Sequence, residues 1–596
     1  MNIEASNRLL VASLAALLMS GLGAAGCKQS SEKSTDQPPV AQPASDQPSD
    51  KQPSAEQPPD EQPVDAQPSN APPPGKLPAD MKTAADIPAG IAIPDEMDTR
   101  LGKLTFVDGA PSNDTVEKVF DHLDFTNALN AYMNGYQLAS LGAMRNGLQS
   151  VGVEDNGGVL LFSELMDSQS LFLTANADTV YYIFVIDVKD GPMVVETPPD
   201  ALGLFDDFWF QHVIDFGRPG PDRGQGGKFL LVPPGYDGPL PDSGYHVANS
   251  STYKVMAFGR SFLKDNDPRP TVETIQKAMK IYRYTPGGYG TSIATLLEGK
   301  TPVGLKAPPI KPVKFVEGSG LALNTLPPSD HTYFDLINDV VQSEPGGTLS
   351  AEIMGSFAAI GITKGKPFKP DARMKKILAE AAEVGAATGR SLNWRFREKD
   401  GWGYYPGSAW YNMLWQGGSG FETPPPAVTK DGIKPYPPTG YRTLDSRFGF
   451  FSVATGITPA MSMRLTDVGS QYLIAAVDSD KNYFDGAKTY KVRLPKNIPE
   501  NNFWSFTVYD NQTRSMLRTP QRYPRAGSQS YPSPAAVPNR DGSYDIYFGP
   551  KAPEGKEANW IQTVPGKGWF TILRVYSPLQ PYFDKSWRIG EIQLVK

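Results

Sequence analysis

The sequence is poor in the residues that build metal and redox centres. Among its 596 residues there are one cysteine and four histidines. A single cysteine excludes a disulfide scaffold, a cysteine-ligated zinc site and an iron–sulfur cluster. None of the histidines stands in an H-E-x-x-H motif, so a zincin-type metalloprotease is excluded as well.

The chain has no excess of positive charge. It also contains no familiar catalytic motif. It has 57 Lys and Arg against 64 Asp and Glu, a net charge of −7. A nucleic-acid-binding protein is expected to carry a basic stripe, so no nucleic-acid partner is predicted. No G-x-S-x-G elbow, Walker loop or dinucleotide fingerprint occurs. The motifs therefore identify no reaction.

A short apolar run, residues 9–18, is followed by small residues and by Cys27. The run is shorter than the roughly 20 residues that a bilayer-spanning helix needs, and it fits the core of a signal peptide over residues 1–26. Residues 24–27, Ala-Ala-Gly-Cys, resemble a bacterial lipobox, with alanine where leucine is usual. We predict lipidation of Cys27; a plain cleaved signal is the alternative. Lys28 resembles an outer-membrane address, so the predicted location is the bacterial cell envelope, with the lipid anchor in the outer membrane.

Residues 27–90 form a stretch rich in proline and without an apolar face. Gln-Pro recurs with a strict period of five residues from position 37 to position 67. Such a segment cannot bury enough apolar surface to offset the entropy of ordering, so we predict a disordered linker, extended by its prolines. It would be a spacer between membrane and folded body, or a low-complexity expansion with no length requirement.

The folded body is predicted to consist of two β-sandwiches and a helical region. Runs of β-branched and aromatic residues, separated by Gly, Pro and Asp, predict two sets of strands. The first set covers 179–188, 193–197, 208–216, 228–232 and 253–258, and the second covers 472–477, 490–494, 503–509, 544–548 and 569–576. The expected domains are 91–265 (a helix and the first sandwich), 266–420 (helical middle) and 421–596 (second sandwich).

The helices are predicted from apolar residues at helical spacing. Residues 116–148 have this spacing, and Gly135 and Gly142 are expected to break the helix into two pieces. The helices expected in the middle region are 271–281, 334–341, 351–360 and 371–389.

The two strand sets match each other in order. Phe208-Trp209 corresponds to Phe503-Trp504, and an aspartate follows each tryptophan by six residues, at Asp215 and Asp510. We infer a divergent internal duplication, and hence an α+β, mainly β fold with two jelly-roll-like β-sandwich domains. The alternative is that short β-strands resemble one another by chance.

Two strings carry a resemblance to a known family. They are N-x-D-T-x-Y at 176–181 and F-W-S-x-T-x-Y-D at 503–510, with the strand 227–232 between them. They resemble a two-domain bacterial family, the paired domains of unknown function 1254 and 1214, over about 110–596. The resemblance implies jelly-roll-like sandwiches with a helical insert. It implies no reaction and no catalytic residue.

Four polar residues are candidates for ligand binding. Asn176, Asp178 and Tyr181 would form a polar cluster at the mouth of a sandwich, where a buried carboxylate binds a ligand hydroxyl. The alternative is a turn cap that bonds backbone N–H groups. His212 is the fourth candidate, although strand alternation places it on the face opposite Asp215. Its alternative role is that of a satisfied core or surface histidine.

Aromatic residues are densest between positions 394 and 415. Glycines interrupt this stretch, which predicts that part of it is loop. Exposed rings on a loop suit sugars or apolar ligands, so Trp402, Tyr404 and Trp410 are further candidate ligand-binding residues. The alternative is a packing hub between the helical middle and the sandwiches.

One acidic loop is compatible with calcium. Residues 478–482 place Asp and Asn oxygens at alternate positions, which supplies three ligands from one loop. Tyr483 stands where an EF-hand has glycine, and Thr489 where it has glutamate. A hairpin turn is therefore the preferred interpretation, with calcium as the alternative. No other metal or cofactor is expected.

Together these features predict a non-catalytic cell-envelope lipoprotein that binds a carbohydrate or another small ligand. One alternative is an envelope hydrolase that uses carboxylates such as Asp178, Asp215 or Asp510, two of which would have to lie about 5–10 Å apart. The other is a structural subunit of an envelope assembly, including a homo-oligomer, with sheet edges as interfaces.

Overall fold

The computed structural model describes residues 88–286, 309–397, 401–412, 417–423 and 440–596, together with residues 297 and 414 and the strands 427–429 and 432–434. The predicted signal, the predicted lipidation site Cys27 and nearly all of the predicted linker lie outside the described residues. Residues 87–596 form one compact unit. Within the described part, no helix has the length and apolar character required to cross a membrane.

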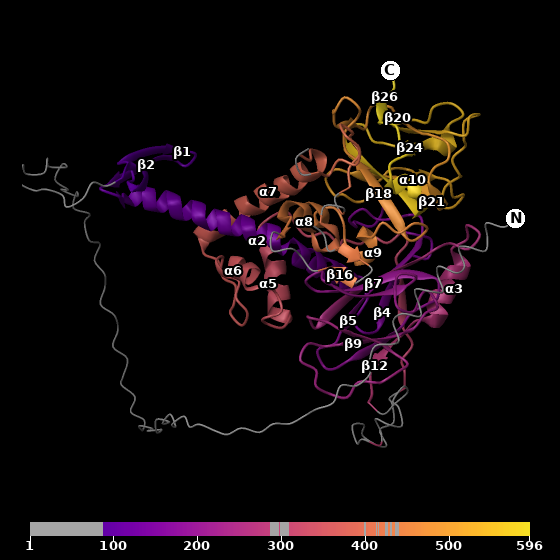
Figure 1. Ribbon diagram of the computed structural model, residues 1–596, viewed down its shortest axis with the longest axis horizontal. Helices are drawn as coiled ribbons and strands as arrows, with labels where there is room; N and C mark the ends of the chain where they lie inside the picture. The colour runs from indigo at the N-terminus through magenta and orange to yellow at the C-terminus, as the bar shows by residue number, and fades with distance from the viewer. Residues whose placement is uncertain are drawn as a thin grey trace, which may run out of the picture. The chain divides into compact units, whose positions relative to one another are not determined.

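The first sandwich has a six-stranded sheet, β13-β4-β5-β11-β7-β8, and a four-stranded sheet, β10-β9-β6-β12 (Figure 1). Side chains alternate between the faces of a strand, and Tyr182 and Phe184 of β5 join Phe229 of β9 in the core between the two sheets. The bounds are β4 Gly158–Leu161, β5 Val180–Asp187, β6 Met193–Glu196, β7 Ala201–Asp207, β8 His212–Gly217, β9 Lys228–Val232, β10 His246–Asn249, β11 Lys254–Ser261, β12 Lys280–Arg283 and β13 Lys314–Glu317.

The second sandwich repeats this arrangement near the C-terminus. Its larger sheet has the order β18-β25-β21-β22, with β19 also paired to β25, and its smaller sheet has the order β24-β23-β20-β26. Val492, Phe506 and Leu573 lie in the core between them. The bounds are β18 Ser470–Ala475, β19 Phe484–Asp485, β20 Tyr490–Leu494, β21 Glu500–Asp510, β22 Arg525–Gly527, β23 Tyr544–Gly549, β24 Trp560–Gln562, β25 Gly568–Pro578 and β26 Gln593–Leu594.

The two sandwiches have the same topology. The order β5-β11-β7-β8 corresponds strand for strand to β18-β25-β21-β22, and β10-β9-β6-β12 corresponds to β24-β23-β20-β26. Even the direction of pairing is kept, because β10 runs parallel to β9 just as β24 runs parallel to β23, while the other equivalent pairs are antiparallel. This confirms the predicted repetition of one sandwich topology.

The residue match that suggested the duplication is nevertheless wrong. Phe503 and Trp504 lie inside β21, whereas Phe208 and Trp209 follow the end of β7, in the turn before β8. Asp207 Oδ1 accepts the backbone N–H of Trp209, at 2.8 Å, and closes that turn. Phe210 has a φ of 53°, which a strand cannot accommodate. The predicted strand 208–216 therefore begins only at residue 212, because aromatic β-propensity conceals the turn.

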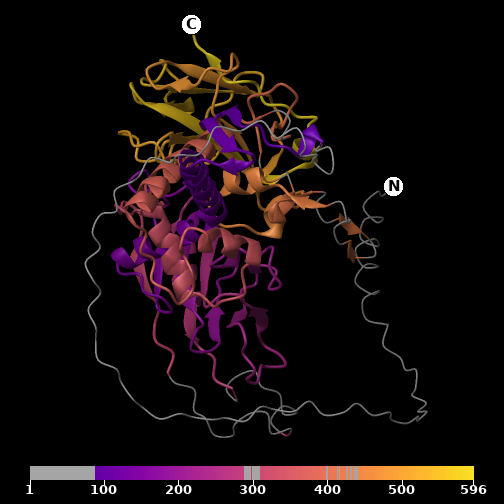
Figure 2. The same ribbon diagram turned by 90° about the vertical axis from the view of Figure 1, so that its left-hand side faces the viewer.

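The helices lie between and beside the sandwiches. Figures 1 and 2 show the long helix α2 with α5, α6 and α7 against it, and α8 and α9 between the two sandwiches. The bounds are α2 Asn113–Ser150, α3 Arg269–Ala278, α5 Tyr333–Ser343, α6 Ala351–Ala358, α7 Ala372–Trp394, α8 Leu444–Phe451, α9 Pro459–Ser462 and α10 Gln580–Phe583. Further short strands are β1 Glu96–Thr99, β2 Gly102–Val107, β3 Ala110–Pro111, β14 Glu422–Thr423, β15 Ala427–Thr429, β16 Gly432–Lys434 and β17 Tyr441–Arg442.

Helix α2 is continuous, which corrects the expected break at two glycines. Ser112 caps it by accepting the Thr115 N–H. A Cβ atom on Gly135 would lie 2.4 Å from Ile337 Cδ1, and one on Gly142 would lie 3.3 Å from Val340 Cγ2, both on α5. The glycines therefore let α5 approach closely, and the packing offsets their cost of about 1 kcal/mol each in a helix.

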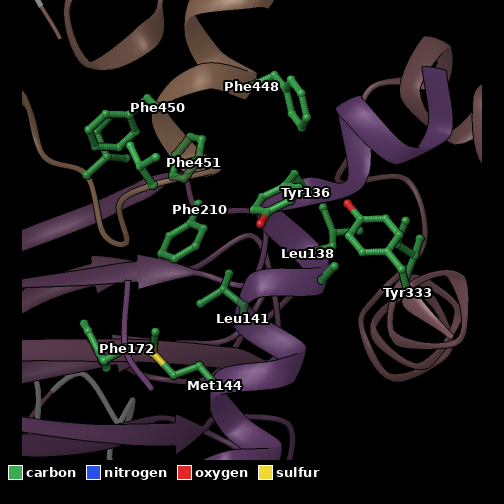
Figure 3. Packing of buried hydrophobic residues seen from close by; sticks show 14 of the residues in the cluster. Tyr136, Leu138, Leu141, Met144, Phe172, Phe210, Tyr333, Phe448, Phe450 and Phe451 are labelled. Carbon is green, nitrogen blue, oxygen red and sulfur yellow. The ribbon is translucent and has the colours of Figure 1, made fainter. Parts of the chain in front are cut away.

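A third core joins the helices to both sandwiches. It contains Ile183 of β5, Ile572 of β25 and the buried face of α2. Figure 3 shows part of it, with Phe450 and Phe451 of α8 near Phe210. The segments predicted as separate domains thus share one apolar core, and the outer faces of the two large sheets contribute to it.

Candidate functional site

A cavity of about 200 Å³ lies between the two large sheets. Its wall is mainly apolar, and it is closed on one side by the segment that contains α8 and α9. The apolar residues of its wall include Phe172, Leu204, Phe258, Phe450, Ile474 and Ile572. A mainly apolar cavity with a few polar groups is the usual form of a small-molecule site.

Two arginines give one part of this cavity a positive charge. Arg260 comes from β11 and Arg574 from β25, the topologically equivalent central strands of the two sandwiches. Arg260 Nη2 donates to Ser470 Oγ at 3.1 Å, and Arg574 Nη2 donates to the Thr174 carbonyl at 2.9 Å. Among the described residues, neither guanidinium has a carboxylate within 4.0 Å. The positive charge of the cavity is therefore not neutralised by a direct ion pair.

Tyrosine hydroxyls surround these arginines. Burial alone would raise the pKa of Tyr472, but Arg260, the hydrogen bond between Tyr472 and Ser470, and Arg574 together lower it. Burial opposes the charge on Arg260, yet Tyr472 and Tyr181 raise its pKa, so it stays protonated. The phenol and guanidinium groups thus supply hydrogen-bond donors where an anion would be stabilised.

A histidine between two aspartates adjoins the cavity. His212 Nδ1 lies 3.8 Å from Asp206 Oδ1, and His212 Nε2 lies 3.8 Å from Asp215 Oδ2. Burial raises the pKa of Asp206 to about 7 and also raises that of Asp215. Burial would lower the pKa of His212, but the two aspartates raise it. The two aspartates therefore favour the protonated form of the imidazole, and of the three residues Asp215 lines the cavity.

Strand alternation had separated His212 from Asp215, and this expectation is wrong. The pairing of β7 with β8 shifts between Phe205 and Asp206, where a β-bulge turns the strand. A bulge leaves one residue unpaired and re-aims the side chains that follow. His212 therefore lies beside Asp215 rather than on the opposite face.

Asn176 and Tyr181 line the cavity, but Asp178 is buried beside it. Asp178 accepts hydrogen bonds from Arg525 Nε at 2.6 Å, Ser505 Oγ at 2.7 Å and Tyr576 OH at 3.0 Å. Burial would raise its pKa, but Arg525, Arg574 and the hydrogen bond from Ser505 together lower it. Asp178 thus joins the two sandwiches, and the two strings that carry the family resemblance meet at Ser505.

Trp402, Tyr404 and Trp410 do not form an exposed platform. Their side chains are buried, with Trp410 at 0% exposure. Trp402 Nε1 donates to Ser446 Oγ at 3.0 Å, and Trp410 Nε1 donates to the Gly590 carbonyl at 2.9 Å. The glycine-rich stretch that predicted exposure is instead packed inside the protein. Tyr404 and Trp410 lie in the core of the second sandwich, and Trp402 lies in the core that joins the helices to the sandwiches.

The remaining acidic candidates close turns. Asp510 Oδ1 accepts the Gln512 and Thr513 N–H groups, and its other oxygen binds Lys567. Asp478 Oδ1 accepts the N–H groups of residues 480 and 482, so its loop is a turn. In the described part of the chain, no group of three or more His, Cys, Asp or Glu side chains has an arrangement for a metal ion.

Sequence reasoning missed Arg260, Arg574 and Asp206. A signal for the arginines exists, because each interrupts an otherwise apolar strand, as in K-V-M-A-F-G-R and W-F-T-I-L-R. A charge inside such a run is costly unless it is paired or functional. Asp206 has no comparable signal in the sequence, because it belongs to a pair of aspartates at the end of a strand, where polar residues are common.

Comparison with known proteins places this architecture in a class of uncharacterised proteins. Residues 159–283 match the protein of unknown function DUF1254, and residues 469–580 match the protein of unknown function DUF1214. The chain therefore carries the paired domains of unknown function 1254 and 1214, in that order, with one domain in each sandwich. No curated protein matches the chain.

Two solved structures are similar to the chain over most of its length. The VPA0106 protein from Vibrio parahaemolyticus is 19% identical, with a TM-score of 0.43 over 79% of this chain and 100% of that one. An uncharacterised protein from Burkholderia cenocepacia is 12% identical, with a TM-score of 0.33 over 81% of this chain and 98% of that one.

Proposed function

We propose that the protein binds a small amphipathic anion in the cavity between its two sandwiches. The observation that carries this proposal is the pair Arg260 and Arg574, which have no carboxylate within 4.0 Å among the described residues and border a mainly apolar space. Guanidinium groups bind carboxylates with directed hydrogen bonds. The apolar wall would bury a hydrocarbon body at about 25 cal/mol for each Å² removed from water.

The predicted ligand is a carbohydrate or another small molecule, and this proposal narrows it to an amphipathic anion. A carbohydrate needs many hydrogen-bonding groups and often an exposed aromatic face, and the rings expected to supply that face are buried. The cavity instead offers mainly apolar contacts and a localised positive charge. A fatty acid or a similar carboxylate matches these two features.

Replacing Arg260 with alanine is expected to weaken the binding of decanoate about 10- to 100-fold. A hydrogen bond to a charged group contributes about 1.5–3 kcal/mol, which corresponds to this range of dissociation constants. The measurement is isothermal titration calorimetry on the wild-type protein and the variant. Arg283→Ala is the matched control, because that side chain is 53% exposed and lies near Asp190 on the surface.

A second variant tests the cavity without removing its charge. Ala454, which follows α8, lines the cavity, and Ala454→Phe would occupy ligand space. We expect this variant to lose decanoate binding while it keeps its fold by circular dichroism. The proposal is wrong if wild-type protein binds no fatty acid, or if both variants bind decanoate as tightly as the wild type.

We also propose that the protein is held at the bacterial cell envelope by a lipid on Cys27. The support is the position of this single cysteine after an apolar run and small residues. Cys27→Ser is expected to abolish incorporation of labelled palmitate and to release the protein from the membrane fraction. Ser31→Ala is the control, and it should change neither. Unchanged labelling of Cys27→Ser would exclude the anchor.

A further inference from the structure

Asp215 presents an unused hydrogen-bond acceptor at the cavity. The residue is 8% exposed. Its Oδ2 accepts the Thr458 hydroxyl at 2.7 Å, but its Oδ1 is buried and has no hydrogen-bond partner among the described residues. A buried acceptor left unpaired is unfavourable. Thr458 also lines the cavity, so a ligand in this space reaches the neighbourhood of that oxygen.

Strand register places Asp215 well apart from Arg260. Asp215 is paired with Leu204, and Leu204 is paired with Phe258 on the next strand. Arg260 follows Phe258 by two residues and therefore lies on the same face. Two strand spacings and two residues of rise separate the Cα atoms of Asp215 and Arg260 by roughly 12 Å. Leu204 and Phe258 line the cavity between these two polar groups.

The surroundings of Asp215 favour a neutral donor over a cation. His212 Nε2 lies 3.8 Å from Asp215 Oδ2, and Asp206 on its other side raises the pKa of the imidazole. A protonated imidazole would repel a ligand ammonium group, whereas a hydroxyl group can donate to the free carboxylate oxygen. The Thr458 hydroxyl already shows this type of contact with the other oxygen.

We propose that Asp215 forms a second polar subsite, so that the ligand class is an amphipathic acid with a hydroxyl group remote from its acidic group. Arg260 and Arg574 take the anionic end, Leu204 and Phe258 contact the hydrocarbon, and Asp215 accepts the hydroxyl hydrogen bond. His212 and Asp206 are positioning residues, which hold the Asp215 carboxyl group at the wall. This inference depends on the proposed function in one respect only, which is that Arg260 and Arg574 bind the anionic end of the ligand.

The test compares decanoic acid with ω-hydroxydecanoic acid on the same protein by calorimetry. We expect the wild type to bind the hydroxy acid about tenfold more tightly, as one additional hydrogen bond provides. Asp215→Leu, which has no acceptor, should remove this preference, and Asp215→Asn, whose neutral carbonyl is a weaker acceptor than a carboxylate, should reduce it. Both variants should leave the affinity for decanoic acid within about twofold. Asp190→Asn, a change at an exposed aspartate, should keep the preference.

The outcomes separate the two proposals. If neither acid binds, the proposed function fails. If both acids bind the wild type equally, or if the preference survives in both Asp215 variants, the second subsite is wrong while the anion site stands. ω-Aminodecanoic acid is the third probe, and tighter binding of the amine than of the alcohol would also overturn the hydroxyl assignment. If Asp215→Leu fails to fold, Asp215→Asn provides the test of the subsite, because it keeps the shape of the side chain.

Discussion

Replacing Asp178 with alanine is expected to lower the free energy of unfolding by about 3–5 kcal/mol. The Asp178 and Arg525 side chains are both completely buried, with 2.6 Å between Oδ1 and Nε. Alanine would leave the Arg525 guanidinium uncompensated in the interior, and the hydroxyls of Ser505 and Tyr576 would lose their acceptor. The measurement is urea-induced unfolding followed by fluorescence and circular dichroism.

A double variant separates the ion pair from the loss of packing. Asp178→Leu combined with Arg525→Leu removes both charges, and it should cost less than Asp178→Ala because no unpaired charge stays buried. A loss below about 1 kcal/mol in Asp178→Ala would contradict the role of this pair in joining the sandwiches.

The Asp178 carboxylate makes the stability of the folded protein depend on pH in the acidic range. Burial would raise the pKa of Asp178, but Arg525, Arg574 and the hydrogen bonds to the carboxylate hold it below its usual value of 3.8. Its contribution to stability is therefore complete above that value, and it is lost as the pH falls through the lower pKa of the folded protein. Between neutral pH and about pH 4, protonation of Asp178 should change stability little.

Replacing Trp410 with alanine is expected to cost about 3–5 kcal/mol of stability, the usual effect of truncating a buried tryptophan. The ring is 0% exposed and contacts the second sandwich core, where it lies 6.2 Å from the Phe506 ring. Its Nε1 atom donates to the Gly590 carbonyl, which would lose that hydrogen bond. The measurement is thermal unfolding by calorimetry, with decanoate binding as a second readout.

An exposed ring provides the control for Trp410. Phe120 is 57% exposed on α2, so Phe120→Ala should change stability by no more than about 0.5 kcal/mol. The folded fraction of Trp410→Ala should keep its affinity for decanoate, because Trp410 does not line the cavity. Unchanged stability together with a lost sugar affinity would instead support a carbohydrate platform at this ring.

Several elements follow from the sequence because their signals are local. The strands predicted at 228–232 and 490–494 coincide with β9 and β20, and the helix predicted to open after Asp371 does so, since Asp371 accepts the Met374 N–H. Each has β-branched or amphipathic runs bounded by Gly, Pro or a capping residue. The repeated sandwich topology also follows, because strand order along the chain limits the possible pairings.

Other elements depend on neighbours that are distant in the sequence. Gly135 and Gly142 look like helix breaks until Ile337 and Val340 are known to pack on them. Trp402 and Trp410 look like an exposed platform, but the helical core covers Trp402 and the second sandwich covers Trp410. In both cases the local propensity is real, but tertiary packing outweighs it.

The amino-acid sequence by itself determined the positions of most predicted strands and the family resemblance, because these depend on periodicity and on motifs within short segments. Only the tertiary structure decided where polar groups meet. Asp178 and Arg525 lie 347 residues apart in the chain, and Arg260 and Arg574 come from different sandwiches. Charge pairing and the formation of a cavity depend on distances in space, and the spacing of residues along one chain does not specify them.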